Sequence, residues 1–187
     1  MSVYEMILKR RTIRKFKQDN VGKDVLEKLV DAARFAPSGA NLQPIKYRIV
    51  NEPSEVAEVF KHLKWAAYIS PEGTPGEGEE PTAYIIILAD SEIRTGGYEL
   101  DIGAAAQNIF LAALEEGIGT CWIGSVNRDK VRAILNISEK FAINSVIALG
   151  YPAESPMVEE EEGSIKYYKD ENGVLHVPKR KLKDIII

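Results

Sequence analysis

Apolar residues recur at the 3.6-residue spacing of an α-helix in five stretches of the chain. The first stretch follows Ser2 and Glu5, whose side chains can each accept a hydrogen bond from the other residue's backbone N–H and so begin a helix. That helix is expected to run into Arg10. The other four are expected between Val25 and Pro37, after a cap at Ser54, over Tyr98–Glu116, and over Arg128–Leu135 with Asn127 as the cap.

Short apolar runs without helical spacing predict the strands. Ala83–Ala89 is apolar at every position, which indicates a strand buried on both faces at the centre of a layered α/β or α+β domain, so helices must cover both faces. Pro71–Pro81 is rich in Gly, Pro and Glu and is expected to form a mobile surface loop. Further strands are expected at Lys46–Val50, Thr120–Ile123 and Ser145–Gly150, with a hairpin around Asn172-Gly173 between Tyr167-Tyr168 and Val174-Leu175.

The predicted helix over Tyr98–Glu116 is apolar on nearly all of its sides and therefore has to be enclosed. The enclosure is either the core of the domain or an interface between subunits. The chain also ends on Ile185-Ile186-Ile187, an apolar tail that is unfavourable in water. Both features favour a homodimer.

The length of 187 residues favours a single domain that spans residues 1–187. Its formal charge of −4 is unevenly distributed. Residues 1–50 carry a net charge of +6 and residues 176–187 one of +3, so the residues between them carry −13. Two basic ends therefore flank an acidic body.

The composition argues against several classes of site. A single cysteine, Cys121, allows neither an internal disulfide nor a multi-cysteine metal site, and two histidines argue against a zinc site. No apolar run approaches the roughly 20 residues that cross a bilayer, and the N-terminus does not resemble a signal peptide, so we expect a cytoplasmic protein. Phosphate-loop, dinucleotide and hydrolase motifs do not occur, which leaves hydrolase triads and Walker-type nucleotide hydrolysis without support.

The main cationic feature is the segment Lys9–Lys17. Arg10 and Arg14 share one face whether the backbone is helical or extended, and Thr12 joins them if it is extended. Two guanidinium groups and a hydroxyl suit a phosphate, because guanidinium offers paired donors to anionic oxygens. Taken alone, the segment is also typical of a solvated helix end. Nucleic-acid binding is a third interpretation, which the acidic body and the single interleaved aromatic residue weaken.

A loop of small and amide side chains, Pro37-Ser38-Gly39-Ala40-Asn41-Leu42-Gln43-Pro44, follows the second predicted helix. It is either a plain connection or a binding loop. In the second case Ser38, Asn41 and Gln43 supply neutral donors and acceptors to the edge of a planar heteroaromatic ligand.

The third candidate is Thr120–Gly124, at the end of a predicted strand. Gly124 would let the backbone approach a ligand closely. Trp122 is expected in the core rather than as a stacking platform. Cys121 has no base beside it in the sequence and is expected to be a small buried hydrophobe.

Together these segments resemble the FMN-dependent nitroreductase family over nearly the whole chain. The matching pieces are Arg10–Arg14, Pro37–Pro44, Asp101–Asn108, Gly117–Gly124, Ala148–Pro152 and Pro178–Arg180. Each is a weak signal alone, but six in the family's order argue against chance. The resemblance implies an α+β, three-layer fold with a mostly antiparallel sheet wrapped by helices. It also implies a homodimer with FMN at the subunit interface and a C-terminal segment packed on the partner.

The resemblance further implies which residues contact FMN. Arg10 and Thr12 would hold its phosphate together with Lys179 or Arg180, and Arg11 would contact the phosphate or the ribityl chain. Arg14 would lie near N1 and the C2 carbonyl of the flavin, and the backbone at Ile123-Gly124 would face N5. The loop residues expected to reach the flavin from the partner subunit are Ser38, Asn41 and Gln43, with Pro37 and Gly39 counted as part of the same site.

The activity implied by the resemblance is that of the cofactor. NAD(P)H would dock on the flavin and transfer a hydride, and an electron-poor acceptor such as a nitroaromatic or a quinone would then take its place in a ping-pong cycle. A fixed cation such as Arg14 would stabilise the negative charge that reduction leaves on the flavin. No side chain is expected to act as a catalytic group in its own right.

Some positions depart from the family pattern. Thr12 stands where Ser is frequent, and Ile45 follows Pro44 where many members carry Trp. Trp65–Pro81 is short where larger members place pocket-forming helices, so no acceptor preference is carried over. The alternatives are a flavin storage or sensor protein without turnover, and a member specialised for enone reduction or dehalogenation.

Overall fold

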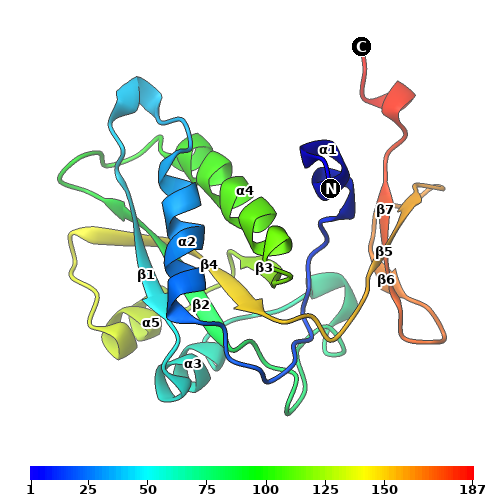
Figure 1. The fold of residues 1–187 in the computed structure, drawn as a ribbon, viewed down its shortest axis with the longest axis horizontal. Coiled ribbons are helices and arrows are strands. Elements are labelled where there is room, and N and C mark those ends of the chain that lie inside the picture. The colour runs from blue at the N-terminus through cyan, green and yellow to red at the C-terminus, as the bar shows by residue number, and fades with distance from the viewer.

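A four-stranded antiparallel sheet forms the centre of the computed structural model, which describes residues 1–187 (Figure 1). Its strands are β1 (Ile45–Val50), β2 (Ala83–Asp90), β3 (Gly119–Ile123) and β4 (Phe141–Gly150), in the order β1-β2-β4-β3. Every residue of β2 is buried, as its uninterrupted apolar run predicts. The predicted α+β fold with a mostly antiparallel sheet is therefore confirmed.

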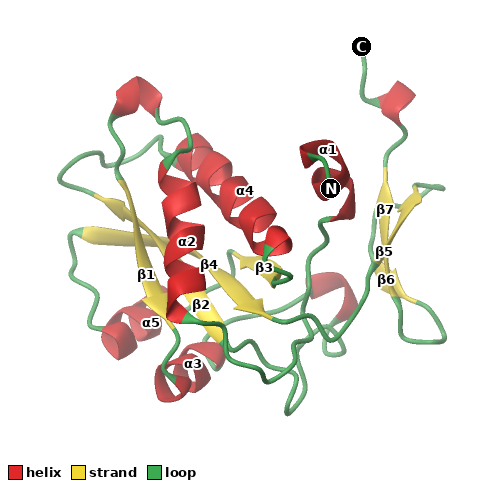
Figure 2. Ribbon diagram, in the orientation of Figure 1, coloured by secondary structure: helices red, strands yellow, loops and turns green.

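Helices cover both faces of this sheet and give the body three layers (Figure 2). The helices are α2 (Lys23–Arg34) and α4 (Glu99–Glu115) on one face, and α3 (Pro53–Phe60) and α5 (Arg128–Leu135) on the other. Because successive side chains of a strand point to opposite faces, Ile85 and Ile87 join the core under α2 and α4, and Tyr84 and Ile86 join the core under α3 and α5. None of the helices combines the length and apolar character that crossing a membrane requires.

The starts of α3 and β4 differ from the predicted ones. The sequence predicts a cap at Ser54, but Glu52 is the N-cap residue and Pro53 begins α3. Proline has a φ close to the helical value and lacks an N–H that the first turn would leave unpaired, so it starts the helix ahead of the serine. β4 likewise begins at Phe141, earlier than expected. The expected Asn127 cap of α5 is present.

The segment Pro71–Pro81 contains no helix or strand, but it does not lie free on the surface as expected. Gly73 and Pro75 are buried. A Cβ at Gly73 would lie 2.3 Å from the Cβ of Ala66, so this glycine packs directly against the turn that precedes the loop. The loop is therefore partly built into the body.

Two parts of the chain stand beside the layered body in Figure 1. α1 (Val3–Lys9) has the predicted capping box between Ser2 and Glu5 but buries none of its residues. The C-terminal part forms a small sheet ordered β5-β7-β6, and its strands are β5 (Met157–Glu160), β6 (Tyr168–Lys169) and β7 (Leu175–Lys179). β6 and β7 form the predicted hairpin around Asn172-Gly173. The tail Ile185–Ile187 is exposed.

His176 connects the three strands of the small sheet. Its Nδ1 lies 2.8 Å from Oε2 of Glu159 on β5, and its Nε2 lies 3.5 Å from Oδ2 of Asp170 in the hairpin turn. The ring stacks on that of Tyr168, with 5.0 Å between centroids. The hydrogen bond to Glu159 is the main cause that raises the pKa of His176 above its ordinary value, and the Asp170 carboxylate adds to it.

The small sheet is therefore expected to loosen as the pH rises. A histidine whose pKa is raised on folding stabilises the sheet fully below its ordinary pKa of about 6.5, and this contribution disappears as the pH rises through the raised value. Amide hydrogen exchange in β7, corrected for its intrinsic pH dependence, should show lower protection at about pH 9 than at about pH 6. Glu159→Gln should remove most of this difference, whereas Glu160→Gln on the same strand should keep it. Equal protection at both pH values would contradict the assignment.

Candidate functional site

The segment that follows α1 lies along β3, at the edge of the central sheet. The backbone N–H of Ile13 donates to the carbonyl of Thr120 at 2.9 Å. Ile13 and Phe16 are buried against Gly119 and Gly150, which are partners in the β3–β4 ladder. A Cβ on either glycine would lie within 2.9 Å of these side chains, so the two glycines allow the segment to pack on the sheet.

Arg10 and Arg11 begin this segment and bring together two guanidinium groups that form no salt bridge. Arg10 lies over the ring of Phe110 on α4, 5.6 Å from its centroid. Arg11 donates to the carbonyls of Leu8 and Arg10 at the end of α1. Burial lowers the pKa of both arginines, and the charge of Arg10 lowers that of Arg11 further. Two uncompensated guanidinium groups, with the hydroxyl of Thr12 next in the chain, are a donor set that suits a phosphate.

Arg14 lines a cavity of about 580 Å³ together with Ile123 and Gly124 at the end of β3. The Arg14 guanidinium lies over the ring of Tyr167, 5.0 Å from its centroid, and its Nε is buried without a hydrogen-bond partner. A Cβ at Gly124 would meet no atom within 4 Å, so packing within the chain does not require glycine there. An unpartnered guanidinium N–H beside uncovered backbone suits the oxygen or nitrogen atoms of a planar bound group. These residues therefore fit a flavin.

Two aromatic residues of this cavity, Trp65 and Tyr167, are not among the predicted contacts. Trp65 precedes the turn Ala67–Ile69, and Tyr167 precedes β6 in the C-terminal part. Tyr167 also packs against Tyr68, with 5.0 Å between ring centroids. From the sequence, Tyr167 is predicted only to flank a hairpin. Its contact with Arg14 depends on where that hairpin lies against the rest of the chain, which the local sequence does not indicate.

Neighbouring residues of β3 face opposite sides of the sheet. Cys121 is buried as expected, and burial raises the pKa of its thiol to about 11, so the thiol stays protonated near neutral pH. The prediction that Trp122 lies in the core is wrong, because the residue is 44% exposed. β3 is an edge strand, and the Trp122 ring makes an edge contact with Phe110 of α4, with 5.8 Å between ring centroids. Its indole N–H donates to the Ser145 hydroxyl at 2.7 Å, which holds the ring beside the cavity.

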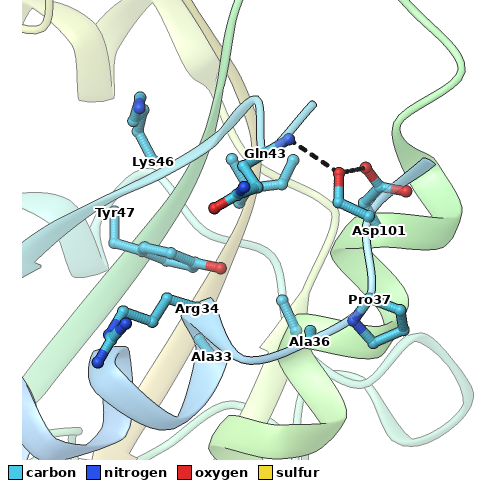
Figure 3. Close-up of a pocket in the computed structure, with 11 residues that line it drawn as sticks. Ala33, Arg34, Ala36, Pro37, Gln43, Lys46, Tyr47 and Asp101 are labelled. Atoms are coloured by element: carbon cyan, nitrogen blue, oxygen red, sulfur yellow. Dashed lines mark hydrogen bonds between the residues drawn. The ribbon is translucent and has the colours of Figure 1, made fainter. Parts of the chain in front are cut away.

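The loop after α2 is held by Asp101 in the first turn of α4 (Figure 3). The Asp101 carboxylate accepts hydrogen bonds from the Ser38 hydroxyl at 2.6 Å and from the Gly39 N–H at 3.1 Å. The Ser38 oxygen accepts a further bond from the Gln43 N–H at 2.9 Å. The bond from Ser38 is the main cause that lowers the pKa of Asp101. Ser38 therefore uses, inside the loop, the hydroxyl that was predicted to contact a ligand.

The backbone of this loop is strained. Ala40, Asn41 and Gln43 have φ values of 51°, 55° and 52°, in the left-handed region that residues other than glycine rarely adopt. Such conformations persist where surrounding contacts enforce them, and they cluster at functional sites. Asn41 and Gln43 are exposed, as are Pro37 and Gly39, so the loop presents both amide side chains at the surface.

The loop and the Arg14 cavity lie toward opposite ends of α4. Asp101, which holds the loop, precedes Phe110, which contacts Arg10, by nine residues or about 14 Å of helix. The cavity of about 210 Å³ beside the loop shares no lining residue with the cavity at Arg14. Within one chain, the structure therefore does not bring the predicted loop contacts to Arg14.

The two predicted C-terminal contacts lie at the end of β7. Lys179 and Arg180 are exposed and form no salt bridge. They belong to the part of the chain that stands on the same side of the body as α1 (Figure 1).

The chain resembles known proteins over most of its length. The model of the family described as "Nitroreductase family" matches residues 7–151. A relative from Archaeoglobus fulgidus, provisionally named NADH dehydrogenase/NAD(P)H nitroreductase, is 32% identical over 157 residues, which is 80% of this chain and 85% of the relative. The matched region contains the Arg14 cavity wall from β3 and the loop after α2, but not Tyr167 or Lys179.

Two solved structures share the fold. A nitroreductase family protein from Clostridium novyi NT aligns with a TM-score of 0.69 and 29% identity, over 81% of this chain and 87% of that one. An FMN-dependent nitroreductase from Clostridium difficile R20291 aligns with a TM-score of 0.64 and 26% identity, over 89% of this chain and 92% of that one.

Proposed function

Because this chain belongs to the nitroreductase family, we propose that it is an FMN-dependent oxidoreductase that takes reducing equivalents from NAD(P)H and passes them to nitroaromatic, quinone or related electron-poor acceptors. The observation that carries the proposal is Arg14, a cation without a carboxylate partner in the wall of a cavity. Bound FMN would supply the redox chemistry, by accepting a hydride from NAD(P)H and passing two electrons on.

The residues of this chain would bind, orient and polarise the cofactor. Arg14 would place a fixed positive charge beside the part of the ring system that becomes negative on reduction, which favours the reduced form. Ile123 and Gly124 would leave the ring edge accessible, since Gly124 has no side chain to cover it. Arg10 and Thr12 would hold the phosphate, with Arg11 beside them.

A second copy of the chain would complete the site. The separation of the loop from Arg14 along α4 supports a flavin held between two subunits, with Asn41 and Gln43 contributed by the partner. The exposed apolar residues of α1 and the tail Ile185–Ile187 are surfaces that a partner would cover. Lys179 or Arg180 would then reach the phosphate. Light scattering of the holoprotein should give the mass of a dimer.

The activity is tested by spectroscopy and steady-state kinetics on one preparation. The purified protein should show the visible bands of oxidised flavin, and anaerobic NADH or NADPH should bleach them. With a nitroaromatic or quinone acceptor, initial rates should give the parallel double-reciprocal lines of a ping-pong cycle, because both substrates use the same face in turn. A yellow protein that neither nicotinamide reduces would instead indicate storage or sensing. A protein that binds no added FMN would contradict the proposal.

A further inference from the structure

Glu154 holds the backbone of the chain at Arg14. It lies in the segment between β4 and β5, and its Oε1 accepts a hydrogen bond from the N–H of Arg14 and another from the N–H of Lys15 at 3.2 Å. One carboxylate oxygen thus receives two consecutive backbone donors. Bonds of this kind to an ionised acceptor are shorter and stronger than those to a neutral one.

The surrounding backbone fixes the carboxylate opposite these donors. The segment around Glu154 pairs with the N-terminal segment in the antiparallel sense, through Lys17 N–H to the Tyr151 carbonyl at 2.8 Å and Ala153 N–H to the Lys15 carbonyl at 2.8 Å. Glu154 is the next residue along, and it extends this pairing to Arg14 by means of its side chain. The contact therefore belongs to an ordered ladder and is not an isolated surface bond.

The charge of Glu154 acts in the same place as that of Arg14. The neighbouring cation, Lys15, pairs with Glu79 at 2.8 Å, and neither Arg14 nor Glu154 forms a salt bridge. Both charges act electrostatically on the Cys121 thiol in the cavity wall: the Arg14 charge lowers its pKa and the Glu154 charge raises it. The electrostatic potential in the cavity therefore reflects the difference between these two charges.

We propose that Glu154 is a positioning residue for the flavin site, which aims Arg14 into the cavity through the backbone and partly offsets its charge, and so sets the reduction potential of the bound cofactor. This inference rests on the proposed function. It assigns the tuning of the potential to a residue outside the region 7–151 that matches the family. The Glu154 side chain therefore has two separable effects: it accepts the hydrogen bonds that hold the backbone at Arg14, and its negative charge partly offsets that of the guanidinium.

Two variants separate these properties. Glu154→Gln keeps an oxygen that accepts from the backbone but removes the charge, so less negative charge opposes reduction. The reduced flavin should gain about tenfold in relative affinity, which is a shift of about +30 mV for a two-electron couple. Glu154→Ala also removes the acceptor of the two backbone hydrogen bonds, so the amides of Arg14 and Lys15 should exchange about tenfold faster with deuterium. Glu154→Gln should change this exchange rate much less. Glu79→Gln is the matched control, because it removes a carboxylate that pairs with Lys15 and should move neither quantity.

The potential is measured by dye equilibration, and exchange is measured on protein without added FMN, so the second readout does not depend on the cofactor. A wild-type potential in Glu154→Gln would overturn the inference while leaving the proposed function intact. Unchanged exchange at Arg14 and Lys15 in Glu154→Ala would overturn it even if the protein binds no flavin. If Glu154→Ala does not fold, the reduction potential of the flavin bound to Glu154→Gln alone tests the inference. If the protein binds no FMN but Glu154→Ala shows the faster exchange, the proposed function is overturned, whereas the role of Glu154 in holding the backbone at Arg14 stands.

Discussion

Arg14→Ala is expected to lower the affinity for FMN about ten- to hundredfold. The guanidinium lines the cavity, its Nε has no hydrogen-bond partner and it forms no salt bridge in the chain, so we expect it to donate hydrogen bonds to the cofactor. A hydrogen bond from a charged donor contributes about 1.5–3 kcal/mol, and each 1.4 kcal/mol corresponds to about tenfold in affinity. Fluorescence titration of apoprotein with FMN measures the change.

The same variant should make the potential of the remaining bound flavin more negative, because removal of a cation destabilises the form that carries more negative charge. Arg14→Lys should lie between wild type and alanine, since lysine keeps the charge but not the paired donors. Arg48→Ala is a suitable control, because Arg48 pairs with Glu55 on the surface and does not line the cavity. Wild-type affinity together with a wild-type potential in Arg14→Ala would refute the role given to this residue.

Asp101→Ala is expected to lower the free energy of unfolding by about 3 kcal/mol, because it removes two hydrogen bonds to a charged acceptor and leaves the Ser38 hydroxyl and the Gly39 N–H without a partner. For a chain of this size the melting temperature should fall by about 6–12 °C. The strained loop that Asp101 holds should also relax, and the retention of FMN should fall with it. Urea denaturation and flavin content per chain, measured at one protein concentration, test both parts.

Glu99→Gln provides the control for Asp101, since it removes a carboxylate from the same first turn of α4 at an exposed position without a hydrogen bond to the loop. Asp101→Asn should be intermediate, because the amide oxygen can accept only part of the network. The pKa of Asp101 is lowered in the folded protein, so its contribution is complete above the ordinary value of about 3.9 and is lost as the pH falls through the lowered value. A melting temperature of Asp101→Ala equal to that of Glu99→Gln would contradict the role of the carboxylate.

Local features of the fold could be read from the sequence because their causes lie within a few residues. The burial of β2 follows from its own uninterrupted apolar run, and the start of α1 follows from Ser2 and Glu5, three residues apart. The error at Ser54 has an equally local cause, since the adjacent proline starts the helix first. The error at Trp122 has no local cause, because its exposure depends on the strand order that places β3 at the edge of the sheet.

In the candidate site, likewise, some features follow from the local sequence and others depend on distant residues. Its residue types, two basic ends, an amide-bearing loop and a glycine at a strand end, are present in the sequence, and the family resemblance identifies what they could bind. Their support comes from distant parts of the chain. Asp101 is 63 residues from the Ser38 that it holds, and Glu154 is 140 residues from Arg14. Hydrophobic periodicity does not predict such pairs, because the distance between the two residues in space depends on how the chain between them folds.

The sequence by itself therefore determined most of the elements, the buried strand, the charge at the two ends and the chemical type of the site, since propensity, capping and hydrophobic spacing act over a few residues. It did not indicate β5 (Met157–Glu160), which forms only by pairing with β7. Only the tertiary structure decided which of these residues meet. It placed Arg14 with Ile123 and Gly124, brought Tyr167 over the guanidinium, and separated the loop from them along α4. Packing between layers fixes these distances, and that packing is a property of the whole chain.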